Sequence, residues 1–301
     1  MKVAFLGLGA IGAPMARHLA RPGFTLAVWN RTRATAERFA AGLPDVRVAA
    51  TPADAARGAD VVMTCLPTSR EVEALLDGAD GLLAGLAKGA TFADCTSGDP
   101  ATSRRIAARL AERGVGFIDA PVSGGVAGAE KGALTVMVGG DAATLERARP
   151  ALACFGSNIV HCGDVGAGDA VKAVNNALLA VHLWSAGEGL ATLTKAGVDP
   201  AIALQVINAS SGRSNSSMNL FPERVLSRAF PRTFRLALLD KDVGIAAELA
   251  RAERVPSPLL QLTAELFRAA HHAQGEAADH VEAVREVERA AGVEIRGGRQ
   301  P

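Results

Sequence analysis

The segment KVAFLGLGAIGAPMARHLA, residues 2–20, decides the fold class of this chain. It opens with a short apolar run, typical of a buried strand, and continues into Gly7, Gly9 and Gly12 in G-x-G-x-x-G spacing. Glycines at these positions permit a tight turn and a close approach of the backbone to a pyrophosphate, and the following helix supplies free N–H groups. The motif alone also fits an ordinary turn, but strand, turn and helix in this order predict a dinucleotide site.

The first half of the chain alternates short apolar runs with helix-forming runs. Such alternation predicts a mostly parallel sheet with helices on both faces, hence a Rossmann-type doubly wound α/β domain over residues 1–163. The expected strands are residues 2–7, 25–30, 60–67, 89–95, 114–121 and 133–140. The expected helices between them are residues 10–20, 33–42, 69–78, 101–114 and 141–155.

From residue 164 onward the sequence predicts helices only. A Gly-rich break, GDVGAGDA, leads into a long connecting helix expected at about residues 167–196. Two later helices, at residues 199–210 and 256–275, open with a proline near their start, which is a favoured helix entry. We therefore expect an all-α substrate and oligomerisation domain over residues 164–301, with a disordered tail RGGRQP.

The residues after the second expected strand bear on the choice of cofactor. NAD-binding domains of this type hold the ribose 2′-hydroxyl with an acidic residue about 20 positions after the glycine turn. This chain instead has Asn30, Arg31, Thr32 and Arg33, which suit a 2′-phosphate that an acid would repel. NADP is therefore the expected cofactor, with NAD as the alternative. Asn30 and Thr32 also suit the capping of the next helix.

Two further strand ends are expected beside the nucleotide, because ligands in open α/β sheets bind at the carboxyl ends of strands. One carries Cys65, Leu66 and Pro67, and the other carries Thr96 and Ser97, whose hydroxyls are expected at the level of the nicotinamide. The predicted nucleotide contacts are thus Gly7, Leu8, Gly9, Ala10, Ile11, Gly12, Asn30, Arg31, Thr32, Cys65, Leu66, Pro67, Thr96 and Ser97.

Two other segments carry candidate chemistry for a substrate. Ser123, Gly124 and Gly125 offer one hydroxyl and two unhindered backbone N–H groups, a set of donors that suits a carboxylate. In VKAVNNALLAV, residues 171–181, one cation and two amides fall at i, i+3 and i+4 and share one helix face. A lysine with its charge at the surface is the ordinary interpretation; a proton-transferring Lys172 beside Asn176 is the functional one.

Taken together, these segments resemble the β-hydroxyacid dehydrogenase family. The resemblance runs through nearly the whole chain, in GLGAIGAPM (7–15), DAPVSGG (119–125) with GAEKGALTVMVGG (128–140), GAGDAVKAVNNAL (166–178) and KDVGIA (241–246). It implies an NAD(P)-dependent oxidoreductase acting on a small β-hydroxy acid or its semialdehyde. The catalytic residues that it implies are Lys172 and Asn176. The implied substrate contacts are Ser123, Gly124, Gly125, Thr96, Phe234 and Asp242, and Lys241 is implied beside the cofactor.

Within this family the sequence leaves the substrate open. SSGR at residues 210–213 is most similar to 3-hydroxyisobutyrate dehydrogenases, whereas NRTR at residues 30–33 is more like glyoxylate and succinic semialdehyde reductases. An NADPH-dependent reductase of tartronate, glyoxylate or succinic semialdehyde is therefore the alternative. Asn175 stands where 6-phosphogluconate dehydrogenases have a histidine, and Lys172 argues against imine reductases. A non-catalytic NADP-binding sensor or scaffold is also expected to lack that lysine.

Composition narrows the partners and the compartment. The net charge of +1 predicts no nucleic-acid partner and no anionic membrane surface. The four cysteines form no CxxC pair, so we expect no metal site and a reduced, cytoplasmic protein. The sequence contains no uninterrupted stretch of about 18 apolar residues, so we expect no membrane span. The apolar helical half predicts a homodimer or homotetramer, because a long helix would otherwise leave apolar surface uncovered.

Overall fold

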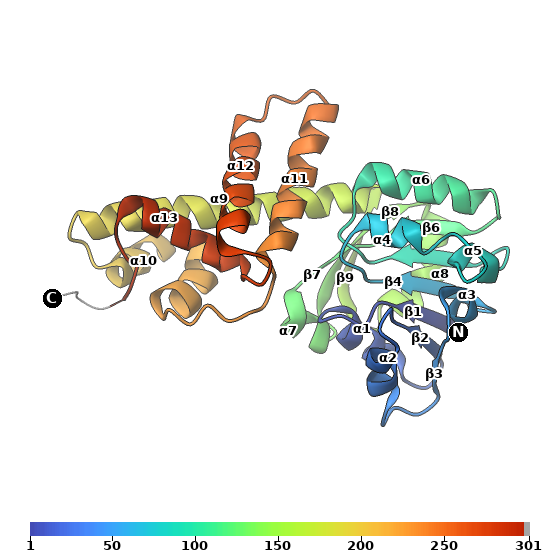
Figure 1. Ribbon diagram of the computed structural model, residues 1–301. Coiled ribbons are helices and arrows are strands. Elements are labelled where there is room, and N and C mark those ends of the chain that lie inside the picture. The colour runs from blue at the N-terminus through green and yellow to red at the C-terminus, as the bar shows by residue number, and fades with distance from the viewer. Residues whose placement is uncertain (298–301) are drawn as a thin grey trace. The chain divides into compact units, whose positions relative to one another are not determined.

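The computed structural model of the protein describes residues 1–297 and contains two compact units, Met1–Lys172 and Ala173–Pro301 (Figure 1). The first unit holds a sheet with helices, and the second has helices and no strand within its described residues. The prediction of an α/β part, a long helix and an all-α part is therefore confirmed. Of the predicted disordered tail, residues 298–301 lie outside the described part of the chain.

The sheet of the first unit is mostly parallel. Its strands are β1 (Lys2–Leu6), β2 (Thr25–Trp29), β3 (Val46–Val48), β4 (Val61–Thr64), β5 (Thr91–Asp94), β6 (Gly116–Asp119), β7 (Val122–Ser123), β8 (Leu134–Gly140) and β9 (Gly156–Gly163). They lie in the order β3-β2-β1-β4-β5-β6-β8-β7, and β9 pairs with β8. Strands β1 to β6 run parallel, β8 is antiparallel to β6 and β7, and β9 is again parallel to β8.

All six expected strands are present, and three shorter or more exposed strands were not predicted. The predicted ones are mostly apolar and do not alternate with polar residues, because both faces of the sheet are covered. In β1, Val3 and Phe5 belong to one core cluster, while Ala4 and Leu6 belong to another. The strands that were missed are β3, β7 and β9; β9 reads GSNIVHCG and is largely exposed, so it lacks this signal.

Eight helices connect the strands of the first unit. They are α1 (Gly12–Leu19), α2 (Arg33–Ala40), α3 (Pro52–Ala56), α4 (Ser69–Ala74), α5 (Leu82–Gly85), α6 (Pro100–Ala111), α7 (Gly125–Glu130) and α8 (Ala142–Leu152). The five predicted helices correspond to α1, α2, α4, α6 and α8. Side chains fix several of their starts: Asp99 and Asp141 each accept from a backbone N–H at the start of α6 and α8, the usual N-cap arrangement.

The long helix α9 (Ala167–Lys195) has 29 residues, close to the predicted 167–196. The second unit continues with α10 (Pro200–Asn208), the π-helix η1 (Ser216–Leu226), α11 (Leu236–Ala252), α12 (Pro258–Gln274), the 3-10 helix η2 (His280–Ala283) and α13 (Val284–Ala291). Its core is built around Phe221, Phe267, Leu183 and Leu239, all fully buried. Among residues 1–297, no helix is both long and apolar enough to cross a membrane.

Candidate active site

The glycine turn between β1 and α1 has the geometry of a nucleotide cradle. Gly7 has φ of +101°, and a Cβ there would lie 2.3 Å from the carbonyl oxygen of Cys65. A Cβ on Gly12 would lie 2.0 Å from the carbonyl oxygen of Gly7. The turn therefore packs so closely that only glycine fits at both positions, whereas Gly9 is exposed and has open space around its Cβ position.

The N–H groups of this turn divide into two sets. Gly7 N donates to Trp29 O at 3.0 Å, and Leu8 N donates to Asn30 Oδ1 at 3.0 Å, so both are bound within the chain. Within residues 1–297, the N–H groups of Gly9, Ala10 and Ile11 have no such acceptor. They stand at the N-terminus of α1, where free N–H groups and the helix dipole favour an anion. The residues present therefore fit the pyrophosphate of an NAD(P) cofactor.

Asn30 acts mainly as a link between loops. Its Oδ1 accepts from Leu8 N, and its Nδ2 donates to Thr32 O at 3.1 Å. Thr32 occupies the N-cap position of α2 but makes no side-chain cap hydrogen bond, so the capping interpretation does not describe these side chains. Arg31, Thr32 and Arg33 are exposed beyond the end of β2, and Arg33 pairs with Glu37 at 2.8 Å. The guanidinium group of Arg31 and the hydroxyl of Thr32 are therefore exposed on the loop that Asn30 joins to the glycine turn.

The loops after β4 and β5 are tied together by polar contacts. Thr96 is buried, and its Oγ1 accepts from Leu66 N at 3.0 Å. Asp94 Oδ1 accepts from Thr64 Oγ1 at 2.8 Å and from Thr96 N at 3.0 Å. Burial raises the pKa of the Asp94 carboxyl to about 6 against these hydrogen bonds. Burial, with the nearby Asp94, also raises the pKa of the Cys65 thiol to about 12, so this thiol stays protonated and does not act as a redox thiolate.

The segment Ser123–Gly125 lies at the junction of β7 and α7. Gly124 and Gly125 have φ of +136° and +64°, backbone conformations that favour glycine. A Cβ on Gly124 would also lie 2.9 Å from the side chain of Leu134. Both glycines are exposed and Ser123 is half-buried, so the hydroxyl and the backbone of this loop are accessible to a small anion.

Helix α9 presents the predicted polar residues in different environments. Lys172 and Asn176 are buried, with 8% and 4% of their surface exposed, whereas Asn175 is exposed. Lys172 is therefore not the surface lysine of the ordinary interpretation. Asn175 Nδ2 donates to Asn176 Oδ1 at 3.1 Å, so the side chain of Asn175 helps to orient that of Asn176.

Within the second unit, Asn176 meets two other predicted residues. Its Nδ2 donates to Asp242 Oδ2 at 2.6 Å, and Lys241 Nζ lies 2.9 Å from Asp242 Oδ1. Asp242 is 2% exposed, so its carboxylate is held between an amide donor and an ammonium group. The structure thus brings Asn176 together with Lys241 and Asp242, a neighbouring pair that lies 66 residues further along the chain.

Phe234 is positioned by two residues, Asp279 and His280, that were not among the predicted site residues. Asp279 is buried, and its Oδ2 accepts from Phe234 N at 2.9 Å and from Thr233 N at 2.7 Å. The ring of His280 lies 5.4 Å from that of Phe234, centroid to centroid. Although burial opposes it, hydrogen bonding to His280 and to these backbone N–H groups holds the pKa of Asp279 well below its usual range. The signal for Asp279 was present, because Asp279 and Glu282 form a capping box.

Known families match almost the whole chain. Residues 2–163 match the family described as the NAD binding domain of 6-phosphogluconate dehydrogenase. Residues 166–287 match the family described as NAD-binding of NADP-dependent 3-hydroxyisobutyrate dehydrogenase. The chain belongs to the 3-hydroxyisobutyrate dehydrogenase-like β-hydroxyacid dehydrogenase family. It is therefore an NAD(P)-dependent dehydrogenase that acts on CH–OH groups.

Similar members of this β-hydroxyacid dehydrogenase family differ in what they act on. The 3-hydroxyisobutyrate dehydrogenase of Pseudomonas aeruginosa is 40% identical over 286 residues, covering 91% of this chain and 93% of the relative. The NAD-dependent L-serine dehydrogenase of the same organism is 39% identical over 274 residues, covering 89% and 91%. A structure of Mycobacterium tuberculosis 3-hydroxyisobutyrate dehydrogenase with L-serine has a TM-score of 0.85 at 31% identity, covering 95% and 98%.

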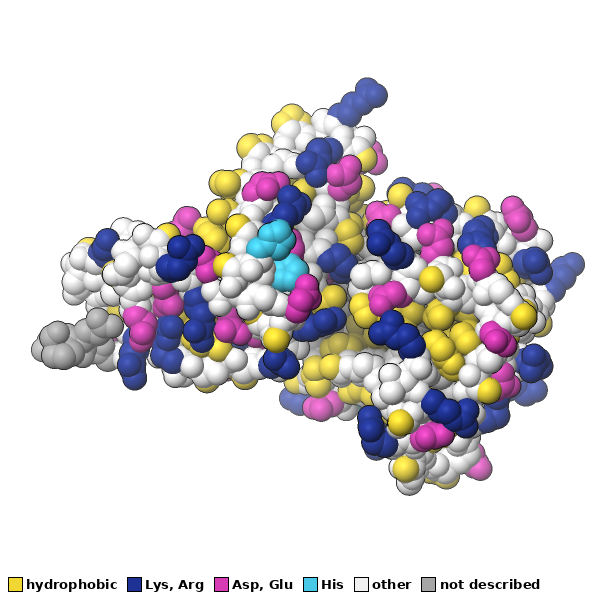
Figure 2. Space-filling view, viewed as in Figure 1, with side chains coloured by type: hydrophobic (Ala, Val, Ile, Leu, Met, Phe, Trp, Pro, Cys, Tyr) yellow, Lys and Arg dark blue, Asp and Glu magenta, His cyan; other side chains and the backbone are white. Residues whose placement is uncertain are grey.

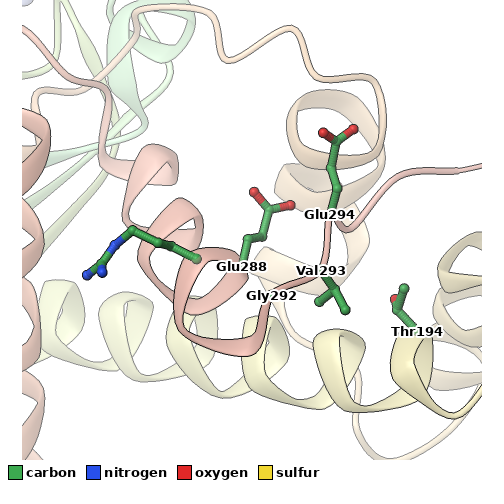
Figure 3. Close-up of a pocket in the computed structure, with 6 residues that line it drawn as sticks. Thr194, Glu288, Gly292, Val293 and Glu294 are labelled. Carbon is green, nitrogen blue, oxygen red and sulfur yellow. The ribbon is translucent and has the colours of Figure 1, made fainter.

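A separate pocket of about 510 Å³ lies in the second unit of this dehydrogenase (Figure 3). It is lined by Thr194, Glu288, Arg289, Gly292, Val293 and Glu294, none of which is a candidate site residue. Glu288 is already bound by Arg228, whose Nη2 lies 3.0 Å from Glu288 Oε2, and by Ile295 N at 2.7 Å. The pocket is thus framed by a structural ion pair and is assigned no catalytic role.

Proposed function

We propose that the protein transfers a hydride between NADP and a small β-hydroxy acid, with 3-hydroxyisobutyrate as the first substrate to test. The observation that carries this proposal is a buried lysine, Lys172, on the helix that also bears Asn176 with its hydrogen bond to Asp242. The nicotinamide supplies the hydride chemistry when it is bound, so the protein residues are left to orient the substrate and to move a proton.

Lys172 is the proposed proton carrier. In the direction of reduction its ammonium group donates a proton to the carbonyl oxygen of the substrate as negative charge develops there. In the direction of oxidation the neutral amine takes the hydroxyl proton. A buried position supports this role because a lysine with only a surface function keeps its charge in water.

The remaining site residues have positioning roles in this proposal. Ser123, Gly124 and Gly125 hold the substrate carboxylate through a hydroxyl and backbone N–H groups. Asn176, fixed by Asp242, holds the substrate oxygen without adding charge. The proposal further assigns Thr96 and Phe234 to the substrate and Lys241 to the cofactor.

NADP is the proposed cofactor in preference to NAD. Arg31 and Thr32 are exposed next to the glycine turn. The residue after β2 is Asn30, an amide, where an NAD site would have a carboxylate. Guanidinium and hydroxyl groups bind a 2′-phosphate by charge-assisted hydrogen bonds. Measurement of KM for both cofactors tests this point, and a clear preference for NAD would refute it.

Substrate identity is tested with a panel of acids run with both cofactors. The panel contains 3-hydroxyisobutyrate and L-serine with NADP or NAD, and tartronate, glyoxylate and succinic semialdehydes with NADPH. Turnover of 3-hydroxyisobutyrate with the highest kcat/KM is the expected result. The basic segment NRTR favours the semialdehyde reductase as second candidate. Absence of hydride transfer across the whole panel would favour an NADP-binding sensor or scaffold.

We also propose a homodimer or homotetramer and a reduced, cytoplasmic location. Val171, Val174 and Leu178 are 45%, 39% and 48% exposed and recur at i, i+3 and i+7 on α9, so they form one apolar stripe. In the view of Figure 2, basic and acidic side chains are interspersed on the surface of both units. Light scattering tests the assembly, and a monomeric mass at micromolar concentration would contradict it. Four free cysteines support the reduced location, which fractionation tests.

A further inference from the structure

The first turn of α9 is capped by a carboxylate from a distant strand. Asp119, the last residue of β6, is fully buried. Its Oδ1 accepts from Gly166 N at 2.7 Å, and its Oδ2 accepts from Asp169 N at 2.9 Å. These N–H groups belong to the N-terminus of the helix, where the dipole favours a negative charge. The start of α9 is therefore fixed to the end of β6.

Two glycines bring this helix start into direct contact with the sheet. A Cβ on Gly139 would lie 2.5 Å from Asp119 Oδ1, and a Cβ on Gly168 would lie 2.3 Å from the carbonyl oxygen of Met137. No methyl group fits at either position. The backbone of the first turn of α9 is thus packed directly against β8.

Asp169 connects the same turn to the loop after β5. It is 1% exposed; its Oδ1 accepts from Gly98 N at 3.0 Å, and its Oδ2 accepts from Ser103 Oγ at 2.6 Å. Gly98 directly follows Ser97, one of the residues assigned to the nucleotide. Lys172 follows Asp169 by three residues, so both lie on one face of the helix, ~4.5 Å apart along its axis.

We propose that Asp119 and Asp169 are positioning residues that hold Lys172 in register with the Thr96–Ser97 loop. This inference rests on the proposed role of Lys172 in proton transfer. Reactions of this kind depend on atomic placement, and a misplacement of about 1 Å lowers a rate about 100-fold. The two carboxylates join three elements, β6, α9 and the β5–α6 loop, at the point where the lysine-bearing helix begins.

Stability alone is a poor explanation for this pair. Burial raises the pKa of both carboxyl groups, and the negative charge of Asp119 raises that of Asp169 further. Two like charges in the interior disfavour the folded state, whereas Asp141 caps α8 at the surface without such repulsion. The buried carboxylates fix the position of the start of α9 relative to β6 and the β5–α6 loop, which a surface cap would not do.

The experiment compares Asp169→Ala, Asp169→Asn and Ser103→Ala, with Asp141→Ala as a matched cap-removal control. For Asp169→Ala we expect kcat to fall by about 10–100-fold, while KM for NADP changes little. Asp169→Asn restores most of kcat, because the amide oxygen still accepts from Gly98 N and the amide nitrogen can donate to Ser103 Oγ. Asp141→Ala lowers thermal stability with kcat unchanged below its unfolding temperature.

Hydrogen exchange of residues 96–99 and 167–172 gives a readout that is independent of turnover. Faster exchange at both segments in Asp169→Ala, but not in Asp141→Ala, is expected. Unchanged kcat in a folded Asp169→Ala variant, or no recovery in Asp169→Asn, overturns the inference. If Asp169→Ala does not fold, an unchanged kcat in Ser103→Ala overturns it. If the wild-type protein turns over no acid in the panel, the proposed function fails. The positioning role is then tested by hydrogen exchange alone, and unchanged exchange at both segments in Asp169→Ala decides against it.

Discussion

Substitution of Gly12 is expected to damage both the fold and the nucleotide site. A Cβ at this position would lie 2.0 Å from the carbonyl oxygen of Gly7, whereas ordinary contact begins at 3.4 Å. Helix α1 or the turn must therefore move by ~1.4 Å, and such overpacking costs about 1–3 kcal/mol. At roughly 2–4 °C per kcal/mol for a unit of this size, Gly12→Ala should lower Tm by about 2–12 °C.

The same displacement moves the N–H groups that are proposed to meet the pyrophosphate. Loss of one charge-assisted hydrogen bond is worth about 1.5–3 kcal/mol, so the Kd for NADPH should rise roughly 10–100-fold. Both quantities are measurable on the same protein, Tm by calorimetry without nucleotide and Kd by fluorescence titration.

Gly9→Ala is the matched control, because nothing lies within 4 Å of its Cβ position and its φ is not positive. This variant should keep the wild-type Tm and yet bind NADPH more weakly, since a methyl group there stands beside free N–H groups. A wild-type Tm for Gly12→Ala would show that the turn is not closely packed. An equal loss of Tm in Gly9→Ala would show that the distinction between the two glycines is wrong.

Three further outcomes are expected. Lys172→Ala should lower kcat by about 100- to 10,000-fold while the Kd for NADPH, measured by fluorescence, stays near the wild-type value; near-normal turnover would refute its role. Asp279→Asn should lose about 1–3 kcal/mol at pH 7 in urea unfolding. Because the folded-state pKa of Asp279 is depressed, its contribution is present above the unfolded pKa of about 3.9 and is lost as the pH falls, so the difference between the two proteins should shrink toward pH 3. A constant difference would contradict that linkage. Gly189→Ala, inside α9 and two turns before its end, with nothing within 4 Å of its Cβ position, should gain about 0.5–1 kcal/mol in the same assay, and a loss would show hidden crowding.

Continuous apolar runs and glycine spacing made the main part of the fold predictable. Strand β4 reads VVMT and is buried at every residue, and its hydrophobic run is visible in the sequence. Strand β9 pairs with β8 along the sheet, but its residues Ser157 and Asn158 are exposed, and its pairing depends on a partner distant in the chain. A window of sequence contains no information about such a partner.

The candidate site was predictable in its residue types and less so in its contacts. The spacing of Lys172 and Asn176 placed them on one helix face, as the helix confirms. The hydrogen bond from Asn176 to Asp242 spans 66 residues, and the one from Gly98 to Asp169 spans 71. Such contacts arise only when separate elements pack together, so they follow from tertiary structure and not from local pattern.

The polar residues at the strand ends show why ligand-binding residues and residues that hydrogen-bond neighbouring loops cannot be told apart in the sequence. Asn30 stands where a dinucleotide motif expects a ribose contact, yet its two amide atoms join the glycine turn to the β2–α2 loop. An aspartate there could accept from Leu8 N but could not donate to Thr32 O. Thr96 likewise uses its hydroxyl oxygen to accept from Leu66 N. Because backbone groups at strand ends need partners when buried, the same amides and hydroxyls that suit a ligand also stabilise the loops that form its site.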